Sequence, residues 1–325
     1  MRALIACAAV VLCAELVSTG APDAGQGTAP SPTFRAETQG VRVDVSVTRR
    51  GRPVTDLKAA DFELHDAGIV QQISDLSFEK APIDVTVAFD ISQSVTGAVL
   101  DQLRRAVEEV RRRLREGDRV RLITFNMRVA RLLDFTDRRE ETAPAFARVV
   151  PAGSTSLFDA IAVALTSAAP ADRRQLLVVF SDGQDTGSIT REGVLLDVAR
   201  HTTATVAFVL SGALLTSQAP QGVLAPPSTP GSTPSPLMTM GTAAQRRPLP
   251  QVFRDLATET GGVVLPAGSG DVSAAFARIL EDFRSVYVLH FSPSGTQAAG
   301  YHELEVRVTR SGQYDVRARQ GYFAD

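Results

Sequence analysis

The feature that most constrains the fold is a regular alternation of apolar, strand-like runs with amphipathic helical segments from Ile83 onward. Three of the runs, at 82–90, 174–183 and 203–212, have apolar centres without the alternation of a half-exposed strand. Such runs are typical of parallel strands that helices cover on both faces. We therefore predict an α/β fold with a doubly wound, mostly parallel, Rossmann-like sheet. Its last strand is expected at VYVLHFSP (286–293).

Segments with a different pattern flank this α/β region, which we place at 81–293. Residues 34–80 include the alternating stretch VRVDVSVTRR (41–50), which predicts a half-exposed strand, and another strand is expected over VQQISDLSF (70–78). Residues 294–325 are predicted to form a β-hairpin that turns at Ser311–Gly312. Because each flanking segment is too short to fold alone, we expect the two to pack together as a small β subdomain.

The first 21 residues have the composition of a secretory signal peptide. One early arginine is followed by an apolar run of about twelve residues and then by small residues, which is too short to span a bilayer comfortably. We therefore expect export to the periplasm or beyond, with a flexible leader at 22–33. Both cysteines, Cys7 and Cys13, lie in the signal segment, so the mature chain is expected to have no disulfide. No other stretch of the sequence resembles a membrane span.

The amino-acid composition predicts a segment without regular structure, and the net charge bears on the class of partner. Residues 216–249 are rich in proline, serine, threonine and glycine and have almost no periodicity, so we expect a long disordered insertion. The formal net charge is −2, so no global basic field points to nucleic acid or anionic lipid.

Small oxygen-bearing side chains gather where the predicted strands end. Asp90, Ser92 and Ser94 follow the strand at 82–90, Asp182 follows the strand that begins at Arg174, and Thr155 precedes a helix. In an open parallel sheet, ligands bind beyond the carboxyl ends of the strands. We therefore expect two carboxylates and three hydroxyls to meet at one edge of the sheet.

This set of side chains suits a hard divalent cation. Mg²⁺ prefers six oxygen ligands and usually keeps some of its water molecules. Serine and threonine hydroxyls are neutral, so they can hold the ion without cancelling its charge. The cation would then remain electrophilic enough to accept an anionic oxygen from a partner.

The motifs also resemble a known family. Asp90-x-Ser92-x-Ser94, Thr155 within GSTSLFDA and Asp182 within FSDG match, in order and loop context, the metal-ion-dependent adhesion site of von Willebrand factor A domains. The resemblance covers roughly residues 82–292. It is strongest to a bacterial secreted group in which a β segment with "DF-x-L" precedes the domain and "Y-x-L-x-F-x-P" follows it; these read DFEL and YVLHFSP here.

The resemblance implies Mg²⁺ or Mn²⁺ held by Asp90, Ser92, Ser94, Thr155 and Asp182. It also implies a non-enzymatic role in protein binding or adhesion, through a carboxylate that a partner protein donates. One departure concerns the loop, because many such sites read D-x-S-G-S-M, whereas this chain has Gln93 and Val95.

Each site residue also has a structural interpretation. Ser94 and Thr155 are suited to cap helices, and Asp182 is suited to a turn before Gly183. Asp185 and Asp159 are expected to support the site or to lie at the surface rather than to bind the ion.

Two other functions remain open. One is a structural type A scaffold whose metal site is empty or degenerate. The other is a metal-dependent hydrolase, which the sequence favours least. The histidines lie in the flanking β segments, at a helix end or on a strand, and no G-x-S-x-G elbow, P-loop or G-x-G-x-x-G motif occurs.

Overall fold

The computed structural model describes residues 40–78, 82–166, 173–211, 249–267, 272–297 and 299–324. The predicted signal peptide at 1–21 and the leader at 22–33 lie outside these residues. So does the predicted insertion at 216–249, except for Leu249, with which a helix begins.

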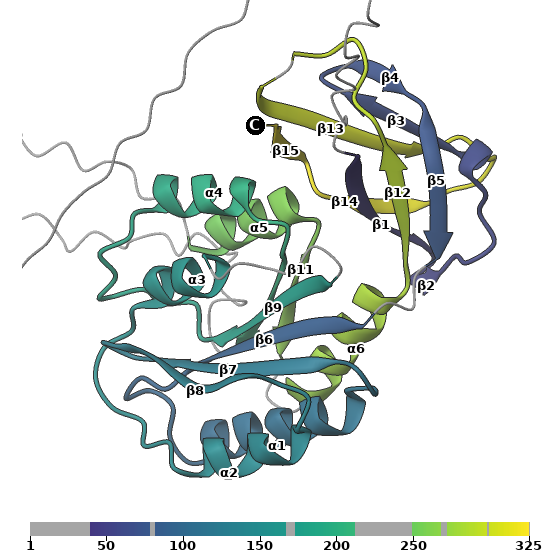
Figure 1. Cartoon of the computed structure of the whole chain (residues 1–325). Helices are drawn as coiled ribbons and strands as arrows, with labels where there is room; N and C mark the ends of the chain where they lie inside the picture. The colour runs from purple at the N-terminus through teal and green to yellow at the C-terminus, as the bar shows by residue number, and fades with distance from the viewer. Residues whose placement is uncertain are drawn as a thin grey trace, which may run out of the picture. The chain divides into compact units, whose positions relative to one another are not determined.

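The centre of the α/β part is a six-stranded sheet with the order β11-β10-β9-β6-β7-β8 (Figure 1). The first five strands in that order are parallel, and β8 at the edge is antiparallel to β7. The prediction of a doubly wound, mostly parallel sheet is therefore confirmed. In chain order the strands are β6 (Ile83–Asp90), β7 (Arg119–Phe125), β8 (Val129–Thr136), β9 (Arg174–Ser181), β10 (Thr205–Ser211) and β11 (Val263–Ala267).

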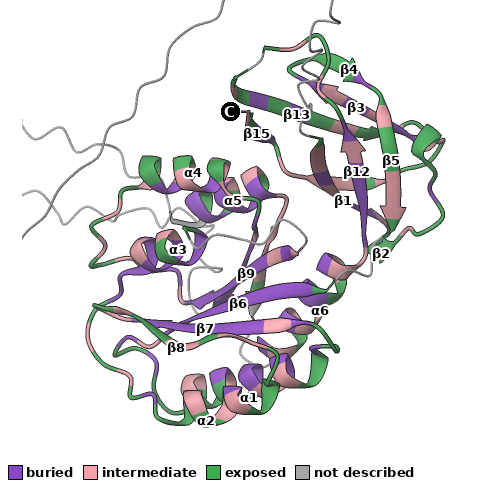
Figure 2. Ribbon diagram, viewed as in Figure 1, coloured by how far each residue is buried: buried purple, intermediate pink, exposed green. Residues whose placement is uncertain are grey.

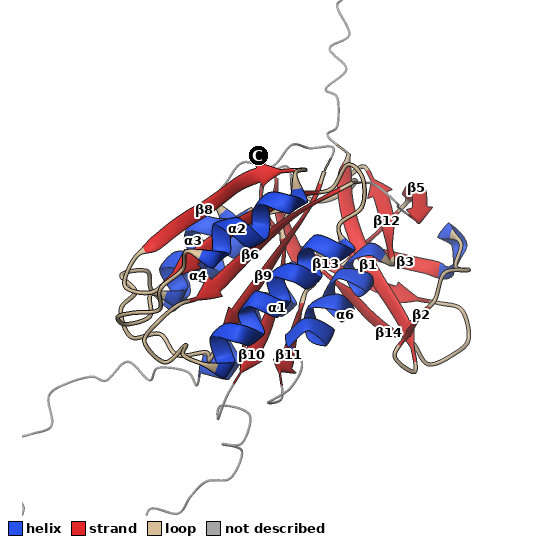
Figure 3. Cartoon of the chain, turned by 90° about the horizontal axis from the view of Figure 1, so that it is seen from below, coloured by secondary structure: helices blue, strands red, loops and turns tan. Residues whose placement is uncertain are grey.

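Helices cover both faces of this sheet, as Figures 1 and 3 show. The apolar cluster on one face includes residues of α1 (Ala98–Arg113), α2 (Thr142–Ala147) and α6 (Val272–Arg284). The cluster on the other face includes α3 (Leu157–Leu165), α4 (Glu192–His201) and α5 (Leu249–Thr260). A short 3₁₀ turn at Arg139–Glu141 precedes α2.

The central strands are buried on both faces, which explains their continuous apolar sequence. Every residue of β6 is buried, and its alternate residues Val87 and Phe89 pack in one cluster while Ala88 packs in the other. The ring of Phe89 stacks on that of Phe180 in β9 at a centroid distance of 5.1 Å. Figure 2 shows the same strands as the most continuously buried part of the sheet.

Two further sheets contain the flanking segments. One has the order β14-β1-β12-β5, with β2 paired to β1, and the other has the order β15-β13-β3-β4. A 3₁₀ turn at Ala59–Asp61 precedes β3. The strands are β1 (Val41–Arg49), β2 (Arg52–Pro53), β3 (Phe62–Asp66), β4 (Ile69–Gln71), β5 (Ile73–Phe78), β12 (Val286–Phe291), β13 (Gly300–Val308), β14 (Asp315–Ala318) and β15 (Gly321–Ala324).

Four predictions about strands were wrong or incomplete. The strand at 286–293 does not close the α/β sheet, because β12 lies between β1 and β5 and is antiparallel to both. VQQISDLSF is divided between β4 and β5, which belong to different sheets. The C-terminal segment is not a simple hairpin, since β13 pairs with β3 and β15, and β14 pairs with β1. The edge strand β11 was not predicted.

The two motifs that flank the α/β region meet in space. The ring of Tyr287, from YVLHFSP, packs edge-on against Phe62, from DFEL, with centroids 5.2 Å apart. The Tyr287 hydroxyl accepts a buried hydrogen bond of 2.9 Å from the backbone N–H of Leu57. Both rings belong to the apolar cluster that the two β sheets share.

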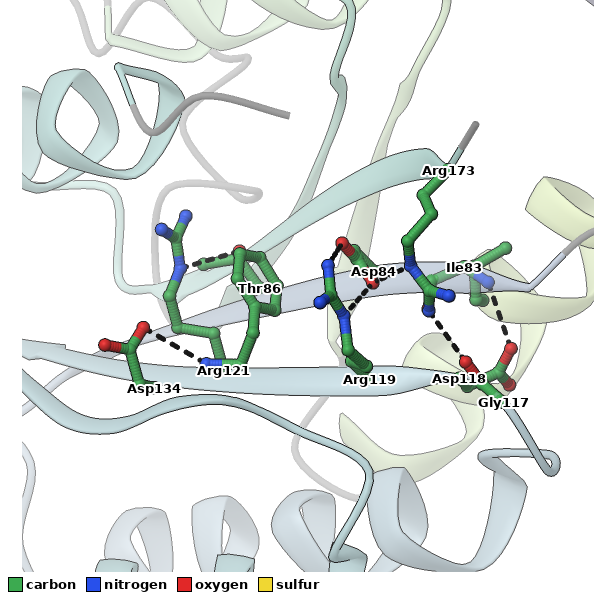
Figure 4. A network of polar contacts seen from close by, with 10 residues as sticks. Ile83, Asp84, Thr86, Gly117, Asp118, Arg119, Arg121, Asp134 and Arg173 are labelled. Carbon is green, nitrogen blue, oxygen red and sulfur yellow. Dashed lines mark hydrogen bonds and ion pairs between the residues drawn. The ribbon is translucent and has the colours of Figure 1, made fainter. Parts of the chain in front are cut away.

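An ion-pair network holds the amino ends of the central strands (Figure 4). The Asp84 side chain is fully buried and forms ion pairs with Arg119 and Arg173. Nearby, Asp118 accepts a hydrogen bond of 3.1 Å from the backbone N–H of Ile83. These charges occupy the amino edge of the sheet. The carboxyl edge, where ligands bind in open parallel sheets, is at the opposite end of the strands.

Candidate metal centre

Asp90 and Ser181 are the terminal residues of two neighbouring strands. Strands β6 and β9 are parallel with Phe89 opposite Phe180, so the residues that follow them are also neighbours. The Ser181 hydroxyl donates to Oδ2 of Asp90 at 2.9 Å, and the backbone N–H of Ser92 donates to Oδ1 at 2.9 Å. Both carboxylate oxygens are thus held in place by the fold.

The surroundings of Asp90 disfavour the ionised form of its carboxyl group. Its side chain is almost completely buried. Burial raises the pKa of Asp90 and the charge of Asp182 raises it further, although hydrogen bonds from Ser92 and Ser181 act in the opposite direction. A bound cation would favour the ionised carboxylate at such a position.

Three further oxygen atoms form a continuous chain beside Asp90. The Ser92 and Ser94 hydroxyl oxygens lie 3.0 Å apart. The Ser94 hydroxyl donates to Oδ2 of Asp182 at 3.3 Å. The loops after β6 and β9 therefore bring two serines and an aspartate together, as the sequence predicted for these three residues.

These spacings fit the ligand shell of a small divalent cation. Adjacent oxygen ligands of an octahedral Mg²⁺ ion, each about 2.0–2.1 Å from the metal, lie roughly 2.9 Å from one another. The separations of 3.0 Å and 3.3 Å are close to that value. Small shifts of the three side chains would let them occupy adjacent positions around one ion.

Thr155 lies in the loop that precedes α3. Its backbone N–H donates to the Thr186 hydroxyl at 3.0 Å, and its carbonyl accepts from the N–H groups of Thr186 and Gly187. Thr155 is buried as a residue, and within the described residues no hydrogen bond of its hydroxyl is found. That hydroxyl is therefore available to a ligand, and the loop after β9 fixes its backbone.

The capping interpretation does not describe this site. The N-cap residues of α1 and α3 are Gly97 and Ser156, and neither helix has a side-chain cap from Ser94 or Thr155. Asp182 does form a turn, because its Oδ1 accepts from the N–H of Gln184 at 3.0 Å while Oδ2 contacts Ser94. Gly183, between Asp182 and Gln184, has a φ of 80°, which a residue with a Cβ rarely adopts.

The two neighbouring aspartates support the loops. Oδ1 of Asp185 accepts from the N–H of Leu157 at 2.9 Å, so this aspartate serves as the cap of α3 from another loop. Asp159 accepts from the N–H groups of Ile189 and Thr190 at 3.1 Å and 2.8 Å. Burial opposes the charge of Asp159, but the hydrogen bonds from Thr190 and Ile189 outweigh it and lower the pKa of Asp159.

Two supporting residues were not predicted. Ser181 orients Asp90, and its hydroxyl also accepts from the N–H of Gly183 at 3.0 Å. Thr186 fixes the backbone of Thr155. A signal for Ser181 was present, since it ends a strand directly before Asp182, but the pairing of Thr186 with Thr155 depends on the fold.

The sequence from the second residue of β6 through the site loops matches a known domain profile. The von Willebrand factor type A domain matches residues 84–223, which include all five predicted ligands. Residues 84–223 are a von Willebrand factor type A domain.

Several solved structures are distantly similar to the chain that carries this type A domain. An aerotolerance-related membrane protein from Bacteroides fragilis has 20% identity and a TM-score of 0.44, over 62% of this chain and 98% of its own. A von Willebrand factor type A protein from Catenulispora acidiphila has 11% identity and a TM-score of 0.45, over 90% and 75%. Proximal thread matrix protein 1 from the mussel byssus, with a zinc-occupied metal-ion-dependent adhesion site, has 13% identity and a TM-score of 0.47, over 66% and 48%. No curated protein matches the chain.

The type A site differs in composition from metal centres built on acidic, histidine or cysteine clusters. Within the described residues, no three such side chains are placed to hold a metal ion together. The candidate site instead combines two carboxylates with three hydroxyls. In the same part of the chain, no helix has both the length and the hydrophobicity needed to cross a bilayer.

Proposed function

We propose that this chain is an exported protein-binding module whose type A domain holds Mg²⁺ or Mn²⁺ and binds a partner's carboxylate. The proposed ligands are Asp90, Ser92, Ser94, Thr155 and Asp182. The observation that supports it most is the spacing of the Ser92, Ser94 and Asp182 oxygens, which suits adjacent positions around one ion. The bound cation would supply a coordination position for a carboxylate oxygen.

The chain's own residues prepare this position. Ser181 and the N–H of Ser92 orient Asp90, so its carboxylate faces the ion without reorganisation. Three of the five ligands are neutral hydroxyls, so the charge of a divalent ion is cancelled in full only when both carboxylates coordinate it directly. Where one of them binds through water, more of the positive charge remains for the partner's carboxylate.

A non-catalytic role fits the surroundings of the site. Two histidines pair with acidic residues in the β sheets: His65 with Glu63 and His302 with Asp66. His201, the last residue of α4, stacks on Phe323 of β15, and His290 belongs to β12. No histidine of the described residues hydrogen-bonds to a proposed ligand, so the site has no evident general base of this type.

We also propose the domain boundaries that the sequence indicated, with one change. A signal peptide at 1–21 and a leader at 22–33 precede the β segment at 34–80, and the type A domain begins near residue 81. Because β12 pairs with β1 and β5, the β subdomain begins at 286 rather than at 294.

A display library of random peptides tests the proposed function. Peptides are selected on the immobilised mature chain in Mg²⁺ and eluted with EDTA. We expect the eluted pool to be enriched in aspartate or glutamate, and we expect the Ser92→Ala variant to retain none of it. Binding that survives both EDTA and Ser92→Ala would indicate a scaffold instead. Turnover of phosphoester or ester substrates that Asp90→Ala abolishes would indicate an enzyme.

A further inference from the structure

Three exposed apolar side chains lie in the loops that build the metal site. Met127, Val150 and Ile189 are 64%, 77% and 91% exposed. They follow β7, precede Thr155 and follow Asp182, respectively. Single exposed apolar residues are common, but three in loops around one site indicate an interaction surface.

Met127 and Val150 are tied to the loops of the proposed ligands. The Met127 sulfur lies 3.2 Å from the position that a Cβ on Gly153 would occupy, two residues before Thr155. Val150 lies two residues before Ala152, whose N–H donates to the carbonyl of Ile91 at 2.9 Å. Both apolar side chains therefore belong to segments that contact the 90–94 and 153–155 loops directly.

Ile189 lies in the loop after β9 that contacts Thr155. Its backbone N–H donates to Asp159 in the first turn of α3. Two residues earlier, the N–H of Gly187 donates to the carbonyl of Thr155 at 2.8 Å. The backbone of this loop is thus hydrogen-bonded on both sides of Ile189, which leaves the side chain presented to solvent at a fixed place.

The charges near the three apolar residues favour an anionic partner. The exposed side chains between them are neutral, and the exposed charged residues next to them in sequence are basic, Arg128 beside Met127 and Arg148 two positions before Val150. Opposite charges at the rim of an interface steer the partner toward it. The neutral exposed residues of these loops include Gln93, Ser154, Gln184 and Thr186, whereas the acidic Asp159, Asp182 and Asp185 are partly buried.

We propose that Met127, Val150 and Ile189 form an apolar rim that contacts apolar side chains flanking the acidic residue of a partner protein. This proposal rests on the proposed function, because the acidic residue is the one that the cation binds. The chain segment 212–248, which follows β10 at the same edge of the sheet, contains no aspartate or glutamate. This segment therefore cannot supply the carboxylate, and we assign the occupant to a segment of another molecule.

Matched synthetic peptides test the rim. Two short fluorescein-labelled peptides carry a central glutamate flanked on both sides either by leucine or by serine, and two more carry glutamine in its place. Their affinities are measured by fluorescence anisotropy in saturating Mg²⁺ and in EDTA. We expect the leucine-flanked glutamate peptide to bind at least tenfold more tightly than the serine-flanked one, and only in Mg²⁺.

Variants of the apolar rim test whether its residues cause the preference for the leucine-flanked glutamate peptide. In Met127→Ser/Ile189→Ser we expect the ratio of the two affinities to fall to about twofold or less, with the Mg²⁺ affinity and melting temperature unchanged. Val70→Ser is the matched control, because Val70 is 63% exposed on β4, outside the six-stranded sheet. This variant should keep the full preference.

The outcomes separate the rim from the metal site. Equal Mg²⁺-dependent binding of both glutamate peptides would overturn the rim and leave the proposed function intact. An equal loss of preference in Val70→Ser would also overturn it, and so would the absence of peptide binding by a chain that binds Mg²⁺. Binding that needs neither Mg²⁺ nor glutamate would contradict the proposed function itself.

Discussion

The Ser94 hydroxyl lies 3.3 Å from Oδ2 of Asp182, although 88 residues separate the two in the sequence. The contact forms because β6 and β9 are parallel neighbours, so the loops after them begin at the same edge of the sheet. It joins the two halves of the proposed metal site. Its position at the rim of the sheet means that the site can be altered without disturbing the apolar core.

The hydrogen bond from Ser181 to Asp90 predicts that a residue outside the ligand set controls metal affinity. In Ser181→Ala the Oδ2 atom of Asp90 loses its donor, and we expect Mg²⁺ affinity to fall about 10–100-fold, as for other partners of metal ligands. Isothermal titration calorimetry measures the change. Ser77→Ala, in β5, is the control and should bind Mg²⁺ like the unaltered chain. Equal affinity in Ser181→Ala would show that Asp90 does not depend on this bond.

Asp185 is predicted to stabilise the fold and not to bind the ion. Asp185→Ala removes the acceptor of the N–H groups at the start of α3, so we expect the free energy of unfolding to fall by about 1 kcal/mol. Urea denaturation measures this change. The neighbouring Gln184→Ala, at an exposed position, should leave stability unaltered. A complete loss of Mg²⁺ binding by folded Asp185→Ala would place Asp185 among the ligands instead.

The hydrogen bonds to Asp159 predict a pH dependence of stability. The folded-state pKa of Asp159 lies below its ordinary value of 3.8, so the folded chain binds fewer protons than the unfolded chain in acid. The stabilisation is therefore present above 3.8 and is lost as the pH falls through the lowered pKa. We expect Asp159→Asn to be less stable than the unaltered chain near neutral pH, and the difference to shrink below 3.8. Denaturant titrations over this range check it; a difference that grows in acid would contradict it.

The Asp84 network is predicted to matter for stability far more than exposed ion pairs do. Asp84→Ala removes the buried carboxylate that pairs with Arg119 and Arg173, and we expect a loss of about 3–5 kcal/mol in the free energy of unfolding. The control is Asp134→Ala, which removes an exposed pair with Arg131 and should cost about 0–1 kcal/mol. Similar losses in the two variants would show that the network at the amino ends of the strands contributes little.

The sequence predicted the α/β fold class because local patterns determine it, and the same patterns led to the proposed site residues. The buried strands β6 and β9 have apolar runs without alternation, and the predicted ligands end or follow these strands or precede α3. The same reasoning misplaced β12, because its continuous apolar run, VYVLHF, fits the middle of an antiparallel sheet as well as a parallel one. It also missed β11, whose short run contains Pro266 and occupies a sheet edge.

What the sequence could not provide was the pairing of residues far apart in the chain. The alternation of β13 and β14 predicts strands but does not say that they enter different sheets. The support that Thr186 gives Thr155, and the contact of Tyr287 with Phe62, likewise depend on which segments the fold brings together.

The measurement that tests the central claim most directly is calorimetric titration of Mg²⁺ into the mature chain, beside Ser92→Ala and Ser154→Ala. Ser154 is an exposed serine next to Thr155 and serves as the control. We predict saturable one-to-one binding by the unaltered chain and by Ser154→Ala, and at least a tenfold loss of affinity in Ser92→Ala with an unchanged melting temperature. No saturable binding, or equal binding by Ser92→Ala, would contradict the proposed metal centre.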